Sequence, residues 1–358
     1  MSGAAHLDFR SDTRTAPDAA MRRAMAAARV GDDAYGDDPT VGRLESEGAR
    51  LLGTEAAVLL PSSTMSNLVA VLAAAPAEGT PLIAGRATHI AHFEAAAMRR
   101  FARTPVTAVR QDADGMLDAE PVRQALTTGD RHVVCMENTV MLCEGNALPP
   151  SSQTELAVLV EHHGAHLHLD GARLANAAVA HGRPVSDMTA GAHSVTFCLA
   201  KGLGAPVGSL LGGSAEFVDR ARGLRLDLGG TMHQSGVLAA AGLEALQRVP
   251  HLADDHALAE LLATELDRVE GADVPAPSRR TNIVTVRLPG MPEQLLRQRL
   301  ADRGVLVLPL FDGYVRFVVH REHDEASVAG AAAALVHAGE RERGPRRSPS
   351  VLRSEGAM

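Results

Sequence analysis

The chain contains one lysine, Lys201, among 35 lysine and arginine residues. Arginine stays protonated, whereas a lysine amine can lose its proton and attack a carbonyl carbon. A strand-like apolar run, residues 194–199, ends just before Lys201, and a glycine-rich turn, residues 202–204, follows it. An ordinary surface lysine is the alternative. The setting favours a lysine that forms an imine with an aldehyde.

Two other segments carry groups that suit the same chemistry. Residues 62–67 place small hydroxyl side chains where a helix begins, so free backbone N–H groups and the helix dipole favour an anion such as phosphate. Asp170 ends another strand-like run, residues 165–169, and a carboxylate there can keep a pyridine nitrogen protonated. Plain helix capping is the alternative for both segments. Together with Lys201 they describe a pyridoxal-phosphate (PLP) site.

Short apolar runs alternate with helical patterns through the first two thirds of the chain, and residues 153–163 form one such helix. Strands separated by helices of this length predict an α/β fold with a mostly parallel open sheet. Ligands gather at the carboxyl ends of the strands in such sheets. The predicted strands are residues 56–60, 132–137, 165–169, 194–199 and 207–211.

The pattern changes near residue 245. Residues 1–245 are predicted to form an N-terminal arm and a large PLP-binding domain, and residues 246–340 a smaller α+β domain. The polar tail, residues 341–358, is predicted to be disordered. The predicted elements of the small domain are a helix at 251–269 and strands at 281–288 and 314–319.

Composition limits the partners. A net charge of −8 over a mixed surface gives no electrostatic reason to expect nucleic acid or an anionic membrane. No apolar run approaches the roughly 20 residues needed to span a bilayer, and we expect no signal peptide. Cys135, Cys143 and Cys198 lack the spacing of metal ligands. We therefore expect a soluble cytoplasmic protein with reduced thiols.

Several long motifs resemble one family, the L-threonine aldolase branch of the β-eliminating lyases, which are fold type I PLP-dependent enzymes. The resemblance reaches to about residue 330. It implies a large PLP domain, a small C-terminal domain, and a homotetramer built as a dimer of dimers with active sites at the dimer interface. The matching stretches are residues 9–13, 31–40, 61–67, 137–139, 168–174, 200–208 and 281–283.

The resemblance assigns cofactor roles residue by residue. It makes Lys201 the imine-forming lysine and Asp170 the partner of the pyridine nitrogen. Ser63 and Thr64 fall in the phosphate loop, with Asn67 as a further candidate there. His89 matches the histidine that stacks on the PLP ring.

Substrate roles follow in the same way. Ser11, Arg173 and Arg316 match groups around the substrate carboxylate, and Arg173 also matches a group near the phenolic oxygen of the cofactor. Tyr35 matches a residue that approaches the site from a neighbouring subunit. The base that takes the β-hydroxyl proton is left open between His89 and a bound water.

The implied reaction is retro-aldol cleavage of a β-hydroxy-α-amino acid to glycine and an aldehyde. L-Threonine, L-allo-threonine or a bulkier analogue would be the substrate, and the partners would be the amino acid and the aldehyde, with no nucleic acid or membrane. Other PLP reactions stay open, namely transaldolation or aldol condensation, racemisation and β-elimination. A catalytically silent PLP-binding protein is a further alternative.

Departures from the family pattern concern the β-side of the substrate. Val140 and Met141 stand where the family has His-Asn, and the segment before His132 is shorter than usual. His233 replaces an arginine and Leu226 replaces a basic residue. These changes make the region less polar, which suggests a larger or more apolar β-substituent.

A metal site and a nicotinamide site are the rival interpretations. His166, His168 and Asp170 share one face of a predicted strand, as a metal triad would. We disfavour this site because an Asp170 engaged with PLP is not free for a metal ion. Residues 202–208 miss the dinucleotide-binding spacing by one residue and place Pro206 where a helix should open. No metal is therefore expected.

Overall fold

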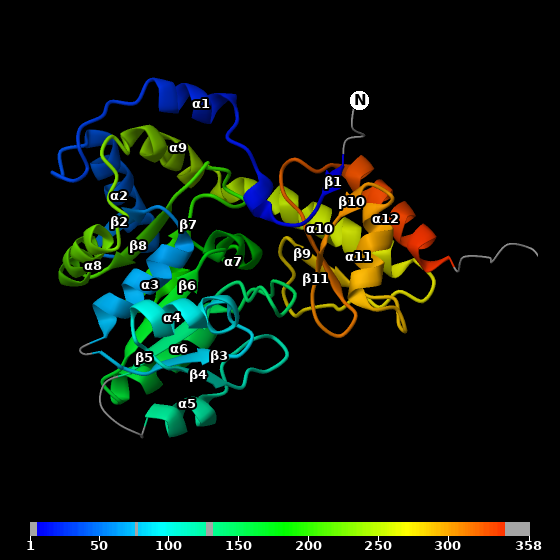
Figure 1. The fold of residues 1–358 in the computed structure, drawn as a ribbon, viewed down its shortest axis with the longest axis horizontal. Coiled ribbons are helices and arrows are strands. Elements are labelled where there is room, and N and C mark those ends of the chain that lie inside the picture. Colours follow the sequence, from blue (N-terminus) through cyan, green and yellow to red (C-terminus); the bar gives the residue numbers. More distant parts are fainter. Residues whose placement is uncertain (1–5, 76–77, 127–131, 341–358) are drawn as a thin grey trace, which may run out of the picture.

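The computed structural model describes residues 6–75, 78–126 and 132–340. The described chain forms a large lobe around a twisted sheet and a small lobe near the C-terminal end (Figure 1). The tail that was predicted to be disordered, residues 341–358, lies outside the described residues.

A seven-stranded sheet forms the centre of the large lobe. Five neighbouring strands run parallel, whereas β8 is antiparallel to the strands on either side of it. This sheet confirms the predicted mostly parallel α/β fold, although β3 and β4 were not among the predicted strands. In sheet order the strands are β2 (Ala56–Leu60), β8 (Ser209–Gly213), β7 (Ser194–Cys198), β6 (His166–Gly171), β5 (Val133–Glu137), β3 (Leu82–Gly85) and β4 (Val106–Val109).

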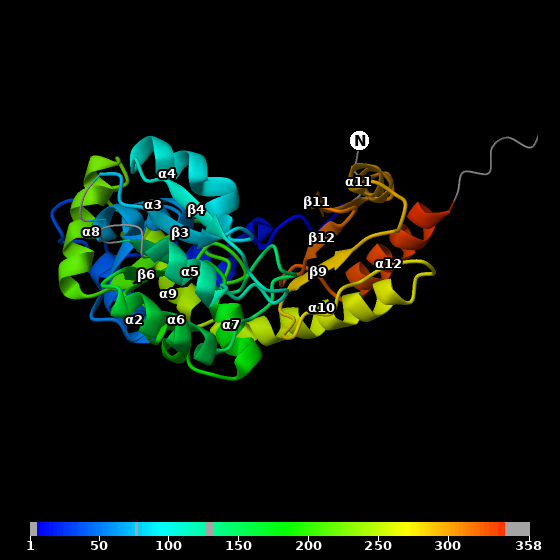
Figure 2. The same cartoon turned by 90° about the horizontal axis from the view of Figure 1, so that it is seen from below.

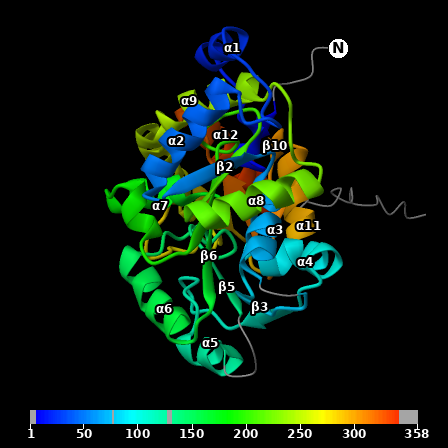
Figure 3. The same cartoon turned by 90° about the vertical axis from the view of Figure 1, so that its left-hand side faces the viewer.

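Helices cover both faces of this sheet, which is why most residues of its central strands are buried. Helices α3, α4 and α8 lie on one face, and α2, α6, α7 and α9 on the other (Figure 2; Figure 3). The predicted helix at 153–163 is α6, which begins three residues earlier at a proline. The helices are α1 (Ala19–Ala26), α2 (Pro39–Leu52), α3 (Ser63–Ala74), α4 (Ala95–Phe101), α5 (Ala119–Leu126), α6 (Pro150–His162), α7 (Leu174–His181), α8 (Ala215–Asp227) and α9 (Gly236–Leu246).

The small lobe packs three helices on an antiparallel sheet of order β11-β12-β9. The predicted helix at 251–269 is α10, and the predicted strands at 281–288 and 314–319 are β9 and β12, both shorter than expected. The elements are α10 (Leu252–Asp267), β9 (Ile283–Val286), α11 (Glu293–Ala301), β10 (Val305–Leu306), β11 (Leu308–Pro309), β12 (Val315–Val318) and α12 (Glu325–Gly339). Short helices η3 (Val185–Thr189) and η4 (Val249–His251) lie between the longer elements.

The N-terminal arm starts in the small lobe. Strand β1 (Leu7–Asp8) pairs in parallel with β10, and Phe9 is fully buried in the core of the small lobe. The Phe9 ring stacks on His323 at 3.9 Å and meets Phe317 edge-on at 5.4 Å. The arm therefore contacts the small lobe, and the predicted domain boundary near residue 245 stays a prediction.

Within the described part of the chain, no helix is both long and apolar enough to cross a membrane.

Replacing Phe9 with alanine tests the attachment of the arm. The variant leaves a cavity in a closed core, so we expect the free energy of unfolding to fall by about 3–5 kcal/mol. Phe101→Ala is the matched control, because Phe101 is 58% exposed and its loss should cost less than about 1 kcal/mol. Urea denaturation of both variants measures the difference, and equal losses would contradict the packing described for the arm.

Candidate active site

A cavity of about 410 Å³ opens at the carboxyl ends of β6 and β7, beside the start of α3. It brings together segments from across the large lobe, as expected for the rim of an open α/β sheet. Seven of the ten predicted site residues line it: Ser63, Thr64, Asn67, His89, Asp170, Arg173 and Lys201.

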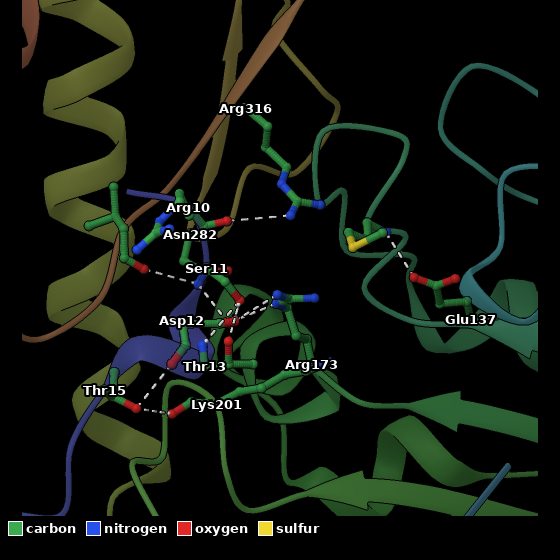
Figure 4. A network of polar contacts seen from close by, with 12 residues as sticks. Arg10, Ser11, Asp12, Thr13, Thr15, Glu137, Arg173, Lys201, Asn282 and Arg316 are labelled. Carbon is green, nitrogen blue, oxygen red and sulfur yellow. Dashed lines mark hydrogen bonds and ion pairs between the residues drawn. The ribbon is translucent and has the colours of Figure 1, made fainter. Parts of the chain in front are cut away.

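Lys201 follows β7 by three residues, and the N-terminal arm holds its backbone. The Thr15 hydroxyl donates to the Lys201 carbonyl oxygen at 2.8 Å, and the Gly204 N–H donates to the same oxygen at 2.8 Å. Gly204 has a φ of +82°, which favours glycine and lets the chain turn directly after the lysine. These contacts fix where the lysine side chain starts (Figure 4).

Asp170 is a fully buried carboxylate near the end of β6. Its Oδ1 accepts from the Ala172 N–H at 3.1 Å, and its Oδ2 accepts from Asn67 Nδ2 at 3.0 Å. Because burying a charge without partners is costly, these bonds make an ionised Asp170 tolerable. A protonated ring nitrogen would supply the missing positive charge.

The start of α3 is suited to bind an anion. Ser62 caps the helix, and its hydroxyl accepts from the Met65 N–H at 3.1 Å. The N–H groups of Ser63 and Thr64 belong to the first turn, where the helix itself offers no acceptor. Both residues line the cavity, so their donors and the helix dipole suit a phosphate group.

Asn67 occupies a different place from the one predicted. Its side chain lies one turn deeper than Ser63, and its amide nitrogen donates to Asp170 and, at 3.2 Å, to Glu94. Its amide oxygen faces His168 Nε2 at 3.2 Å. The three bonds occupy the side chain, so the structure supports a role beside Asp170 rather than on the phosphate.

His89 stands at the mouth of the cavity, just before a short π-helix, η2 (Ile90–Glu94). Its Nδ1 lies 3.2 Å from Glu94 Oε1. Burial acts to lower the pKa of His89, but the hydrogen bond to Glu94 and the negative charge of Asp170 outweigh it and raise the pKa. Glu94 thereby fixes the imidazole ring, which is suited to packing on the face of a flat cofactor.

Arg173 forms a buried two-pronged ion pair with Asp12. The distances are 2.8 Å from Nε to Oδ2 and 2.7 Å from Nη2 to Oδ1. Burial alone would raise the pKa of Asp12, but the Arg173 charge and its hydrogen bonds hold that pKa below its usual range. Asp12 lies in η1 (Asp12–Arg14), so the pair joins the N-terminal arm to the large lobe.

Arg316 reaches the same region from β12 in the small lobe (Figure 4). Burial and the nearby charge of Arg173 lower its pKa to about 10. Its Nη2 donates weakly to the Arg10 carbonyl at 3.5 Å, and its buried Nε has no hydrogen-bond partner in the described chain. A buried guanidinium with open donors is suited to a carboxylate ligand.

Ser11 lies in the N-terminal arm, where Thr13 orients its side chain. Its hydroxyl accepts from the Thr13 N–H at 3.2 Å and from the Thr13 hydroxyl at 2.9 Å. Figure 4 places Ser11 close to Asp12 and Arg173, with Arg316 approaching from above. The arrangement is compatible with a shared carboxylate site, and that role stays a prediction for Ser11.

Glu137 is a cavity residue that the sequence did not identify as functional. Its Oε2 accepts from the His89 N–H at 2.5 Å and its Oε1 from the Met141 N–H at 3.0 Å. Burial and the negative charge of Asp170 raise its pKa to about 7. Its place as the last residue of the predicted strand 132–137, on the ligand rim, was the signal that could have found it.

Tyr35 lies away from this cavity. Its side chain is 84% exposed and lines a separate hollow that also includes Leu226 and Thr231. His233, another departure from the family pattern, lies 3.2 Å from Asp32 in the adjoining segment. A role of Tyr35 in the site of a neighbouring subunit therefore stays a prediction.

The histidines of β6 do not form a metal centre in the described residues, where no group of three potential metal ligands occurs. His166 Nε2 and His168 Nδ1 instead both contact the Ser194 hydroxyl, at 2.7 and 2.9 Å. Cys135, Cys143 and Cys198 are free thiols. Burial raises the pKa of Cys135 well above its usual value, which makes it a poor nucleophile.

The fold is that of the fold type I PLP-dependent enzymes. A solved structure of a Leishmania major threonine aldolase superposes with a TM-score of 0.76 at 20% identity, covering 92% of this chain and 98% of the other. The family model described as beta-eliminating lyase matches residues 8–289, so the chain belongs to that family.

Two relatives extend the match over most of the chain. A probable low-specificity L-threonine aldolase 2 from Arabidopsis thaliana is 41% identical over 333 residues, covering 90% of this chain and 94% of the relative. A low specificity L-threonine aldolase from Escherichia coli K12 is 39% identical over 333 residues, covering 91% of this chain and 97% of the relative. The resemblance inferred from the motifs is confirmed.

Asp12→Asn tests the buried pair. It leaves the Arg173 charge without compensation, so we expect the free energy of unfolding to fall by about 3–5 kcal/mol. Asp8→Asn is the control, because its partner Arg10 is 42% exposed on the side chain and such pairs contribute about 0–1 kcal/mol. If urea denaturation gives the two variants the same free energy of unfolding, the Asp12–Arg173 pair does not stabilise the protein as described.

Proposed function

We propose that this chain is a PLP-dependent aldehyde-lyase. It cleaves β-hydroxy-α-amino acids, such as L-threonine, L-allo-threonine or a bulkier analogue, to glycine and an aldehyde. The observation that carries this proposal is the meeting of Lys201, Asp170 and the start of α3 at one cavity, with Arg173 and Arg316 beside it. The names of the relatives and the family membership support the same reaction.

The residues fit PLP by their chemistry. Lys201 offers the amine, Asp170 the carboxylate for the ring nitrogen, and the first turn of α3 the donors for the phosphate. His89 offers a flat ring for the face of the cofactor. When bound, PLP supplies an aldehyde for the amino group and a ring that accepts electrons from a broken Cα bond.

Arg316 and Arg173 select which bond breaks. The open donors of Arg316, with Ser11 nearby, would hold the substrate carboxylate. Fixing the carboxylate turns the Cα–Cβ bond perpendicular to the plane of the ring, where its electrons can be accepted. The pair with Asp12 keeps Arg173 from moving while this happens.

A proton acceptor for the β-hydroxyl group must lie near the same cavity. His89 and a bound water are candidates from the sequence, and Glu137 is a third. Its pKa of about 7 allows Glu137 to hold or release a proton near neutral pH. Glu137 also fixes the backbone of His89, so both residues contribute to the same wall of the cavity.

We further propose a cytoplasmic homotetramer, a dimer of dimers, in which Tyr35 serves the site of an adjoining subunit. The exposed side chains of Tyr35 and Leu226, 84% and 63% exposed, support contact between copies at this surface.

Arg173 and Arg316, the proposed carboxylate clamp, also argue against a silent PLP-binding protein. A protein without turnover does not need two buried arginines for a substrate carboxylate.

Product analysis tests the lyase assignment. The PLP-loaded protein is incubated with L-threonine, L-allo-threonine or L-phenylserine, and separately with glycine and an aldehyde, and products are identified by mass. We expect glycine and aldehyde from the amino acids at turnover well above an Arg316→Ala variant, which should lose about 100-fold in kcat/KM. A racemised or β-eliminated product would favour those reactions instead, and no turnover would contradict the proposal.

The departures at Val140 and Met141 generate a prediction about specificity. Met141 is buried with Ile283 and Val318, so the position where the family has a polar residue is apolar here. We expect kcat/KM for L-phenylserine to exceed that for L-threonine by about 10-fold, as for added apolar surface in a pocket. Met141→Asn should reduce this preference, whereas equal kcat/KM values in the native protein would refute the hypothesis.

A further inference from the structure

Three residues of β6, namely His166, His168 and Asp170, point to the same face of the sheet because side chains alternate along a strand. Helix α3 packs over this face and contributes Asn67, and the neighbouring strand β7 contributes Ser194. These five side chains form a continuous series of hydrogen bonds that ends at Asp170.

The orientation of Asn67 follows from its neighbours. Its amide nitrogen lies 3.0 Å from Asp170 Oδ2 and 3.2 Å from Glu94 Oε2. Two carboxylates are acceptors, so only the donating end of the amide can face both of them. The amide oxygen must therefore face His168.

The state of His168 follows from Asn67. The Asn67 oxygen can only accept, so the 3.2 Å contact requires a proton on His168 Nε2. Burial lowers the pKa of His168 to about 4, so the ring is neutral and its Nδ1 is an acceptor. The Ser194 hydroxyl, 2.9 Å away, must donate to that Nδ1.

The series continues to His166 in the same direction. Because the Ser194 hydroxyl donates its hydrogen bond to His168, its oxygen is left to accept a hydrogen bond from His166 Nε2 at 2.7 Å. Burial lowers the pKa of His166 to about 3, so this ring is neutral as well. Every donor in the series thus points toward Asp170, and the only charge in the series is the carboxylate at its end.

We propose that Asn67, His168 and Ser194 are positioning residues that hold Asp170 as a fixed, ionised acceptor for the ring nitrogen of the cofactor. The inference rests on the proposed PLP function. Asn67 binds one carboxylate oxygen and the Ala172 N–H the other, which sets the plane of the carboxylate. The series consists of neutral donors, so it stabilises the negative charge without competing for the proton on the ring nitrogen.

Asn67 also connects this series to the other face of the cofactor site. Its second amide proton goes to Glu94, whose other oxygen lies 3.2 Å from His89 Nδ1. Asn67 therefore orients both the carboxylate that would bind the ring nitrogen and the histidine that would pack on the ring face. This explains why a buried amide, rather than a hydroxyl residue, stands one turn into α3.

The test uses holoprotein reconstituted with PLP that carries ¹⁵N at the ring nitrogen. The ¹⁵N chemical shift reports whether that nitrogen is protonated, independently of turnover. We expect Asn67→Ala to move the shift toward that of neutral pyridine and to weaken PLP binding about 10-fold or more, as for loss of a hydrogen bond to a charged group. Ser194→Ala, two links further from Asp170 than Asn67, should move the shift in the same direction by less.

Asn176→Ala is the matched control. Asn176 is also a buried amide bonded to a histidine, with its Oδ1 2.9 Å from His256 Nε2, but it lies outside the series. This variant should keep the native shift and PLP affinity. A native ¹⁵N shift and native PLP affinity in Asn67→Ala would overturn this inference and leave the proposed function standing. If Asn67→Ala does not fold, an unchanged shift in Ser194→Ala would overturn the inference instead. A native protein that binds no PLP would overturn the proposed function as well.

Discussion

A negative charge buried at the end of a central strand is the constraint on which the rest of the site depends. The Asp170 carboxylate is 1% exposed, and no arginine or lysine forms an ion pair with it among the described residues. Such a charge is tolerated only when hydrogen bonds surround it and a cation completes its surroundings. Asn67 and the Ala172 N–H provide the bonds, and a protonated cofactor ring would provide the cation. The same charge raises the pKa values of His89 and Glu137, so it influences both side chains proposed as acceptors for the β-hydroxyl proton.

The N-terminal arm extends this constraint to the small lobe. Phe9 is anchored in the small core, Asp12 pairs with Arg173, and the Thr15 hydroxyl binds the carbonyl of Lys201. Within about seven residues the chain thus contacts a core, the carboxylate clamp and the imine-forming lysine. Arg316 comes from β12 of the same small lobe, so the positions of the two lobes determine the geometry of the clamp.

Much of this arrangement could be predicted because it depends on local signals. Three sequence signals each identify one segment of the rim: the apolar run that leads to Asp170, the run that leads to Lys201, and the hydroxyl-rich start of α3. Parallel strands bring such segments together. The role of Asn67 could not be predicted in this way. Its partners lie 27 and 103 residues away, and a helical turn beyond Ser63 changes which atoms it meets. Asp12 was missed for the same reason, since its role depends on a contact with Arg173, 161 residues away.

Borohydride reduction of the PLP-loaded protein, followed by digestion and mass spectrometry, tests the central claim most directly. The chain has one lysine, so reduction has only one side-chain amine to label. The account predicts a single pyridoxyl group on the peptide that contains Lys201. A protein that gains no label, or gains it only on the N-terminal amine, would contradict the account.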